Sequence, residues 1–456
     1  MMLFPTFTFI LGFLPVTWVI YFLLAKKSDT LPTVWLVATS FIFYSWFNWS
    51  YSLLLASSIL GNWFFAELLY RYRSKLILAV GILCNILLLG YFKYYDFFVE
   101  NINAWVGTDW ALKHILLPLG ISFFTFQQIS FLQLIYSRSL EKRYSFTVYS
   151  LFVSFFPQLI AGPIVLPDEM MSQFDRKENL RPQAENIAEG LYVFAWGLAK
   201  KILLADFFAE FADGGFAGLN GNFFDTWQTV LAYAFQIYFD FSGYCDMAVG
   251  AALLFNIRLP QNFNAPYRAE NFSDFWRRWH ITLGRFLMSG IYIPLGGNRC
   301  GKVRTCVNLL LTFFISGLWH GASWLFVLWG MMHGAALVMH RIWSKFLGLK
   351  MPGMLAKMLT FFFVVLAWVP FRATDWQQTK AIYRALFMPD SMRIHFDCKY
   401  YLFLAVGAVI IAFAPTVTDM QKRFRPTWIN ALVAAILFIA SMFFFVKVSP
   451  FIYFNF

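Results

Sequence analysis

Charged side chains are scarce in this sequence. Only 13% of its 456 residues are Asp, Glu, Lys or Arg, about half of the ~25% that is usual in soluble proteins. So few charges cannot cover the surface of a water-soluble globule of this length. In their place the chain has 60% hydrophobic residues and 21% aromatic residues, which is typical of a protein whose solvent is lipid. The composition predicts an integral membrane protein, so the net charge of +12 does not by itself indicate a nucleic-acid partner.

Cysteines and the common catalytic signatures are few or missing as well. The five cysteines are odd in number, include no CxxC pair and are expected to be buried thiols rather than a disulfide framework. The sequence contains no Walker loop, no HExxH and no GxSxG. The thiols, none of which has zinc-site spacing, are Cys84, Cys245, Cys300, Cys306 and Cys398.

Apolar runs long enough to cross a bilayer recur along the whole chain. The run Val307–Met339 is too long for one upright span, so we expect it to be broken or doubled. The run Tyr149–Ile164 is shorter and contains Pro157, which favours a re-entrant segment. The other expected spans are Phe7–Ala25, Val34–Trp49, Tyr51–Tyr70, Leu76–Tyr91, Ile115–Tyr136, Ile187–Leu204, Val230–Ile257, Met354–Phe371, Tyr401–Ala414 and Trp428–Val446.

Positive charge orients the first half of the chain. With the N-terminus outside, successive spans return the basic clusters 26–27, 71–75 and 138–143 to the cytoplasmic side, as the positive-inside rule requires. No internal repeat and no low-complexity linker are present. We therefore expect a single integral membrane domain over residues 1–456.

A polar island, Arg258–Arg304, carries half of the net charge of the protein. It has eight Lys and Arg residues against Glu270 and Asp274, a balance of +6. One interpretation is a cytoplasmic loop that contacts anionic lipid headgroups. The other is a site for a phosphate-rich ligand, because arginine makes forked, charge-assisted bonds to phosphate.

A histidine, His320, lies inside the long apolar run between Trp319 and Gly321. Ionisable groups at membrane depth are costly and usually face a cavity or a partner. The titration range of imidazole suits general acid–base work, although a membrane histidine is more often a hydrogen-bond partner between helices. We interpret His333, farther along the same run, as a packing residue.

Two carboxylates, Asp240 and Asp246, lie six residues apart in another apolar run. Such residues are unusual at membrane depth. They either contribute to chemistry directly or cap a half-helix and pair with a buried cation, for which Lys200 and Lys201 are candidates.

Six of these segments together resemble membrane-bound O-acyltransferases. They occur in the order of that family, and the resemblance is closest to the bacterial branch that O-acetylates alginate and peptidoglycan. It covers nearly the whole chain and is best over residues 155–334. The segments are Phe155–Pro163, Gln236–Asp246, Asn262–Tyr267, Asp274–His280, Tyr292–Arg299 and Trp319–Gly321.

The resemblance implies an all-α fold, a helical dish around a membrane-crossing pore. The essential histidine of the family matches His320, and a second histidine found in the branch matches His280. The family takes an acyl group from a cytoplasmic thioester, which is acetyl-CoA in the alginate-like members, and needs no metal. A periplasmic or membrane-anchored partner of the SGNH/GDSL esterase type usually completes the transfer to an extracytoplasmic glycan.

One departure bears on the acceptor. Many relatives have Ser-x-Trp-x-Arg-Asp-Tyr after the position of His280, and the positions of the Arg-Asp pair are Met288 and Ser289 here. We therefore expect a protein of the bacterial inner membrane. Its expected acceptor is peptidoglycan or another surface glycan outside that membrane, rather than alginate. Alginate-type polysaccharide, a lipid or a protein remain alternative acceptors, and an anion transporter or a catalytically idle scaffold are alternatives from other classes.

The expected mechanism assigns roles to nine residues. His320 acts as general base on the attacking hydroxyl, and His280 assists from the cytoplasmic side. The candidate phosphate contacts are Arg277, Arg278 and Arg285, and the candidate lining or supporting residues are Trp319, Asp240, Asp274 and Trp276.

Overall fold

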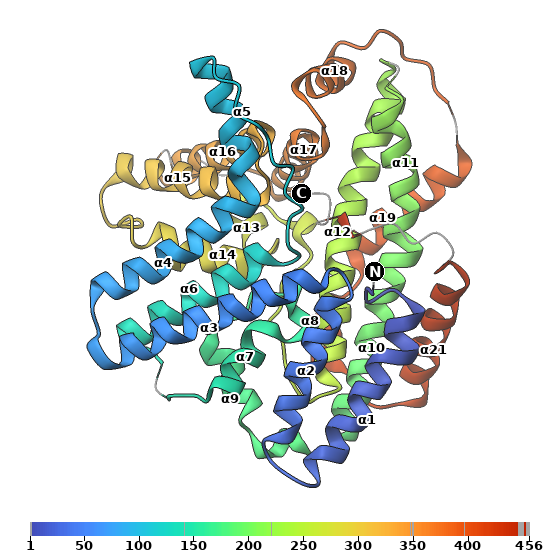
Figure 1. Ribbon diagram of the computed structural model, residues 1–456. Coiled ribbons are helices and arrows are strands. Elements are labelled where there is room, and N and C mark those ends of the chain that lie inside the picture. Colours follow the sequence, from blue (N-terminus) through green and yellow to red (C-terminus); the bar gives the residue numbers. More distant parts are fainter. Residues whose placement is uncertain are drawn as a thin grey trace. The chain divides into compact units, whose positions relative to one another are not determined.

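The described part of the chain is helical (Figure 1). The computed structural model describes residues 2–140, 142–219, 221–346, 348, 351–395, 397–445 and 451–452. Over these ranges no strand is formed, and an isolated bridge joins Asn222 to Ser391. The all-α class that we expected is confirmed.

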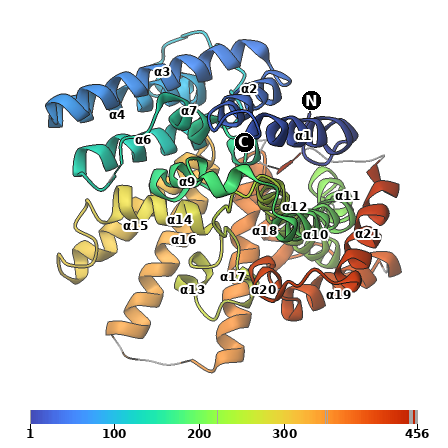
Figure 2. The ribbon, with the colours of Figure 1, turned by 90° about the horizontal axis from the view of Figure 1, so that it is seen from below.

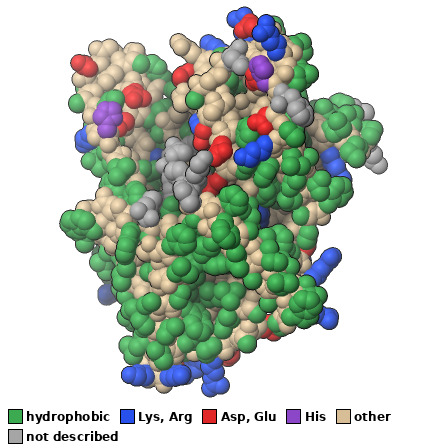
Figure 3. All heavy atoms as spheres, turned by 90° about the vertical axis from the view of Figure 1, so that its right-hand side faces the viewer, with side chains coloured by type: hydrophobic (Ala, Val, Ile, Leu, Met, Phe, Trp, Pro, Cys, Tyr) green, Lys and Arg blue, Asp and Glu red, His purple; other side chains and the backbone are tan. Residues whose placement is uncertain are grey.

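Several helices are long and apolar enough to cross a bilayer. Within the described ranges they number five, or six if one bent pair counts as a single span: Thr8–Ala25, Trp49–Tyr72, Lys75–Val106, Trp324–Ser344, Gly353–Arg372 and the pair Cys398–Phe413 with Val417–Arg423. Large apolar side chains are exposed on these helices, and Figure 3 shows a face on which hydrophobic side chains predominate. Exposed apolar surface on this scale is the signature of a lipid solvent, so the chain is a multi-pass membrane protein.

The chain divides into two compact units, each made of several stretches of sequence. The first unit comprises Met1–Trp196, Tyr244–Pro260 and Arg425–Ile436. Within it α3, α4 and α6 lie side by side (Figure 1). Its helices are η1 (Thr8–Phe13), α1 (Leu14–Ala25), α2 (Leu31–Ser45), α3 (Trp49–Tyr72), α4 (Lys75–Leu89), η2 (Gly90–Tyr94), α5 (Tyr95–Val106), α6 (Ile121–Ser137), α7 (Phe146–Ser154), α8 (Phe156–Leu159), α9 (Pro167–Phe174), η3 (Lys177–Leu180) and most of α10 (Ala184–Ala199).

The second unit comprises Gly197–Gly243, Gln261–Phe424 and Leu437–Phe456. Figure 2 shows α15, α16 and α17 as neighbours within it. Its elements are η4 (Lys200–Ala205), α11 (Asp206–Ala217), η5 (Pro266–Arg268), α13 (Phe272–Trp276), α14 (Ile281–Leu287), η6 (Met288–Tyr292), α15 (Lys302–His320), α16 (Trp324–Arg341), η7 (Ile342–Phe346), α17 (Gly353–Arg372), α18 (Trp376–Phe387), α19 (Cys398–Phe413) and α20 (Val417–Arg423), and α12 (Phe223–Leu253) and α21 (Trp428–Phe443) are shared between the units.

The long apolar run Val307–Met339 is doubled, as its length predicted. α15 ends at His320, and α16 begins at Trp324. Ser323 is the N-cap of α16, since its hydroxyl accepts a hydrogen bond from the backbone N–H of Leu325. The two helices pack closely, because a Cβ at Gly330 would overlap the carbonyl oxygen of Phe313. This close approach holds the end of α15 in a fixed position.

The run Tyr149–Ile164 is broken, also as expected. α7 ends at Ser154, the four-residue α8 follows, and a buried non-helical segment continues from there. The break is capped within the first unit, since the Ser40 hydroxyl accepts from the backbone N–H of Phe156 at 3.1 Å. Irregular backbone of this kind needs protein partners when water is absent.

Candidate active site

His320 is the last residue of α15 and is only 3% exposed. The chain leaves the helix through Gly321, whose backbone is extended (φ −164°) and where a Cβ would overlap the ring of Phe326. A side chain larger than hydrogen therefore does not fit after the histidine. The Trp-His-Gly sequence thus fixes where the imidazole lies.

Aromatic rings surround the imidazole of His320. Its ring centroid lies 4.8 Å from Trp319, 4.8 Å from Trp329 and 5.2 Å from Phe371, in each case nearly edge to face. Edge-to-face contacts restrain a ring without fixing the position of a proton. These three rings contribute to the orientation of the His320 imidazole.

His280 lies in the same unit and is completely buried. Its Nδ1 is 3.1 Å from Asn262 Oδ1, an oxygen that also accepts from the backbone N–H and the hydroxyl of Thr282. Because this oxygen can only accept, Nδ1 carries the ring proton and Nε2 carries the lone pair. Burial lowers the pKa of His280 to about 3, since an imidazolium ion would lose its hydration, and the ring is neutral at neutral pH.

Trp319 connects the two histidines. Its ring centroid lies 5.9 Å from that of His280 and 4.8 Å from that of His320. The structure thus brings the two histidines that the sequence singled out, 40 residues apart, into contact with the same indole ring.

His333, which the sequence analysis interpreted as a packing residue, lies in the same aromatic surroundings. It is 1% exposed on α16, its Nδ1 accepts a hydrogen bond from Trp276 Nε1 at 3.3 Å, and its ring lies 4.9 Å from Trp329. Trp329 also contacts His320, so His333 belongs to the same aromatic cluster. The expectation that His333 only packs was incomplete, because its hydrogen-bond partner Trp276 is 57 residues away in the sequence.

Asp240 forms a separate buried ion cluster in the second unit. Lys201 Nζ lies 3.0 Å from Asp240 Oδ1 and 2.7 Å from Asp206 Oδ1, and the three side chains are 9% exposed or less. Of the two interpretations given for Asp240, pairing with a buried lysine is the one that the structure shows. Asp246, its companion on α12, lies in the first unit.

The basic island Arg258–Arg304 is less uniform than its composition implied. Arg258 lies in the first unit, where it pairs with Glu189, and the guanidinium of Arg268 donates to the carbonyls of Ile411 and Ala414 at the end of α19. Both cations are therefore engaged in holding the fold.

The three arginines nominated for phosphate contact have different surroundings. Arg278 Nε lies 2.9 Å from Asp274 Oδ2, one turn earlier, and its side chain is about one third exposed. Arg277 is exposed, with Nε donating to the Ser273 carbonyl. Arg285 is half-buried on α14, which follows His280 directly.

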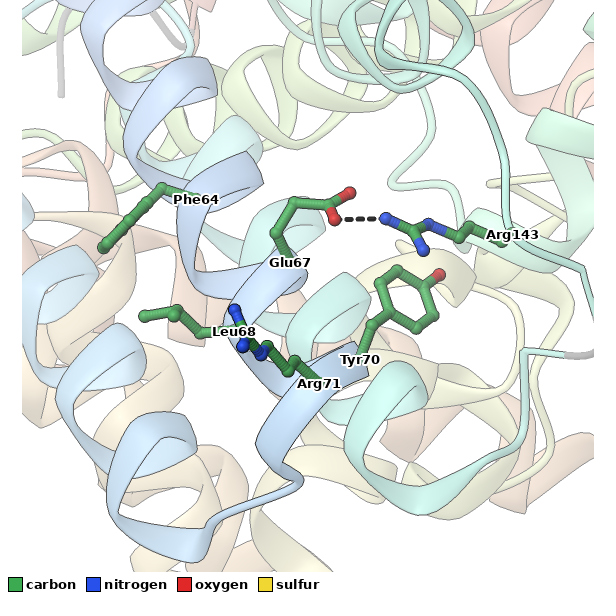
Figure 4. Close-up of a pocket in the computed structure, with 6 residues that line it drawn as sticks. All are labelled: Phe64, Glu67, Leu68, Tyr70, Arg71 and Arg143. Carbon is green, nitrogen blue, oxygen red and sulfur yellow. Dashed lines mark hydrogen bonds and ion pairs between the residues drawn. The ribbon is translucent and has the colours of Figure 1, made fainter.

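A pocket of about 470 Å³ lies in the first unit (Figure 4) and contains none of these residues. The Glu67 carboxylate points at the Arg143 guanidinium and forms an ion pair with it. Over the described ranges, no group of three or more His, Cys, Asp or Glu side chains is arranged to hold a metal ion. The lining residues of the pocket are Phe64, Glu67, Leu68, Tyr70, Arg71 and Arg143.

The fold is that of a polytopic helical membrane protein, and His280 and His320 are buried within it. The chain matches the MBOAT, or membrane-bound O-acyltransferase, family over residues 17–374. This chain belongs to the membrane-bound O-acyltransferase family, and it is a membrane-bound O-acyltransferase enzyme.

Curated relatives narrow the kind of acceptor. The chain is 46% identical to a peptidoglycan O-acetyltransferase of Helicobacter pylori, over 84% of this chain and 80% of the relative. It is 33% identical to a probable alginate O-acetylase of Pseudomonas putida over the full length of both chains. It is also 26% identical to a teichoic acid D-alanyltransferase of Streptococcus thermophilus, over 50% of this chain and 57% of that one. These relatives indicate an acyltransferase that acts on glycans.

Proposed function

We propose that this protein takes an acetyl group from acetyl-CoA on the cytoplasmic side of a bacterial inner membrane and passes it towards hydroxyls of peptidoglycan outside. The observation that carries the proposal is the contact of both His280 and His320 with the ring of Trp319. The identity of 46% to a peptidoglycan O-acetyltransferase supports this acceptor. The missing Arg-Asp pair at Met288 and Ser289 supports the same choice.

His320 acts as the general base in this proposal. It removes the proton from an attacking hydroxyl, whose oxygen forms a bond to the thioester carbonyl carbon while the carbon–sulfur bond breaks. The proton then passes from the imidazole to the departing thiolate, so the step is balanced. His280 orients the donor or relays this proton, for which its Nε2 lone pair is suited.

The basic residues next to His280 contact the donor. We assign Arg277 and Arg285 as contacts to the phosphates of acetyl-CoA. Arg278, whose guanidinium is held by its ion pair with Asp274, is a third phosphate contact. Trp319 and Trp276 line and support the site. A periplasmic or membrane-anchored partner of the SGNH/GDSL type completes the transfer, and lipid surrounds the protein.

A purified preparation tests the catalytic assignment. With radiolabelled acetyl-CoA, we expect His320→Ala to slow acetyl release or transfer by at least ~100-fold, because a positioned acid–base group contributes about 10²–10⁴-fold. His114→Asn is the control, because His114 is exposed in the first unit and asparagine readily adopts its φ of +47°. A folded, membrane-inserted His320→Ala protein with full activity would contradict the assignment.

The acceptor is tested separately. Mass spectrometry of surface glycans from a deletion strain is expected to show the loss of acetylated muropeptides. A second acceptor, an alginate-type exopolysaccharide, is favoured by the full-length match to a probable alginate O-acetylase. Loss of acetyl groups from a secreted polysaccharide, with unchanged muropeptides, would select that acceptor instead.

A further inference from the structure

The buried ion cluster around Lys201 has no task in the proposed chemistry. It sets one ammonium group against two carboxylates, those of Asp206 and Asp240. A buried charge is costly unless it is paired and hydrogen-bonded. A hydrogen bond from a backbone N–H donor to one of these carboxylates stabilises the cluster further.

That donor comes from the C-terminal end of the chain. The backbone N–H of Ile452 donates to Asp240 Oδ2 at 2.8 Å, across a separation of 212 residues. Ile452 is 3% exposed and its neighbour Phe451 is 1% exposed. The two carboxylate oxygens of Asp240 thus have different partners. Oδ1 pairs with the Lys201 ammonium group, and Oδ2 accepts a hydrogen bond from the backbone N–H of Ile452.

Phe451, the neighbour of Ile452, lies close to the candidate active site. The ring of Phe451 lies 5.8 Å from Phe241, the residue after Asp240, and the ring of Phe241 lies 4.8 Å from His280. Phe451, Phe241 and His280 therefore form a continuous row of rings within the second unit.

The local packing places Lys201 where Asp240 can reach it. Lys201 lies in the π-helical turn η4, and Gly243 on α12 faces that turn. A Cβ added to Gly243 would lie 2.8 Å from the carbonyl oxygen of Gly197 and 3.1 Å from the backbone nitrogen of Lys201. Only a residue without a side chain allows the helices this approach. π-Helical turns are also frequent at functional sites.

We propose that Asp240 is a positioning residue that holds Phe451 and Ile452 beside His280, through the backbone N–H of Ile452, so that these two residues form part of the wall of the acyl-transfer site. The inference rests on the proposed function in assigning His280 to that site. A hydrophobic contact alone would not determine which residue of this stretch lies opposite Asp240. A charge-assisted bond to one backbone N–H sets the register of the segment, and it is stronger than a bond between neutral groups.

A cross-linking experiment tests the anchor without any assay of activity. In a full-length protein with its five native cysteines replaced, Phe241→Cys and Phe451→Cys are introduced together, and the rate of cross-linking is measured with a flexible bifunctional thiol reagent long enough to span two phenylalanine side chains in contact. We expect a cross-link to form, and we expect Asp240→Ala to slow it at least tenfold. Asp213→Ala, at a half-exposed acid paired with Arg372, is the control and leaves the rate unchanged. A rate that Asp240→Ala does not change, or no cross-link at all, would overturn the proposal.

A second experiment tests the consequence for transfer. Ile452→Pro removes the donor N–H while retaining both carboxylates and Lys201, and Ile452→Val retains the N–H. We expect Ile452→Pro to lower kcat at least tenfold with little change in the KM for acetyl-CoA or in Tm, and Ile452→Val to stay within twofold of the wild type. Because both changes remove the bond from Ile452 to Asp240, Asp240→Ala combined with Ile452→Pro should retain about as much activity as the less active of the two single variants.

Multiplying losses in the double variant would contradict the positioning role. If even the wild-type protein transfers no acetyl group, the proposed function fails, whereas the cross-linking rate still decides whether Asp240 anchors the segment. The two failures are therefore distinguishable.

Discussion

Among single residues, the two candidate catalytic histidines are held in different ways. The proton of His280 is assigned by Asn262, whose side-chain oxygen accepts from three donors. His320 is restrained by the rings of Trp319, Trp329 and Phe371. The tautomer of His280 is assigned by its hydrogen bond to Asn262, and the aromatic contacts contribute to the orientation of the His320 ring.

The neutral state of His280 has a consequence for stability against pH. Its pKa is about 3 in the folded protein and about 6.5 in an unfolded chain. Above pH 6.5 both states are neutral and the histidine contributes no pH dependence. Below pH 6.5 the unfolded state binds a proton that the folded state does not, so the free energy of unfolding falls by up to ~1.4 kcal/mol per pH unit until pH 3.

A variant that does not titrate measures this effect. We expect the difference in Tm between the wild type and His280→Asn, in detergent solution, to narrow as the pH is lowered from 7.5 to 5. A difference that stays constant over this range would show that the ring is hydrated or charged in the folded protein.

For the helical elements, close packing of α15 against α16 is what places His320. Two glycines make the approach possible: an added Cβ would overlap the Phe313 carbonyl at Gly330 and the Phe326 carbonyl at Gly317. Backbone oxygens cannot move aside as side-chain ends do. The position of the histidine therefore depends on Gly317, less than one turn before it, and on Gly330 in the facing helix.

Gly330→Ala tests this dependence. We expect a loss of about 1–3 kcal/mol in stability, the usual cost of overpacking a close contact, together with a fall in acetyl transfer of more than tenfold. Gly61→Ala on α3 is the control, because nothing lies within 4 Å of its added Cβ, and it should be neutral or slightly stabilising. Equal activity of the two variants would show that the helix contact does not position the site.

These elements show how far a sequence can be interpreted. The doubling of Val307–Met339 followed from its length, and the break near Pro157 followed from its residues. The expected span at Ile115–Tyr136, by contrast, begins only at Ile121, after Gly120 with its positive φ of 69°. Pattern and composition predict which segments are helical, but a glycine turn decides where a helix begins.

Contacts between distant segments were the part that could not be predicted. The Trp276–His333 bond and the Asp240–Ile452 bond join residues 57 and 212 positions apart. No periodicity connects such pairs, because each is brought together by the packing of helices between them. The engagement of Arg258 and Arg268 in structural contacts was likewise invisible in a count of charges.

For the whole molecule, sidedness follows from where the cations lie. The turns between α1 and α2, between α3 and α4, and between α6 and α7 carry the basic clusters of the first half. The positive-inside rule places all three in the cytoplasm. The segment after α5 then lies outside.

Single cysteines test this arrangement in a protein without its five native thiols. Lys27→Cys, Lys75→Cys and Lys142→Cys should react with a membrane-impermeant maleimide only in inverted vesicles, whereas Asp109→Cys should react in intact cells. Labelling of any of the three basic positions from outside would reverse the orientation, and with it the side on which the donor is expected.

The backbone conformation of His280 decides which substitutions at this position can be interpreted chemically. His280 has φ +45°, in the left-handed region, directly before α14. Asparagine and glycine adopt this conformation more readily than other residues do. An alanine substitution would therefore remove the imidazole and strain the chain at once, whereas asparagine or glycine separates chemical loss from conformational cost. The conformation of His280 thus dictates the design of the mutational series as well as the geometry of the site.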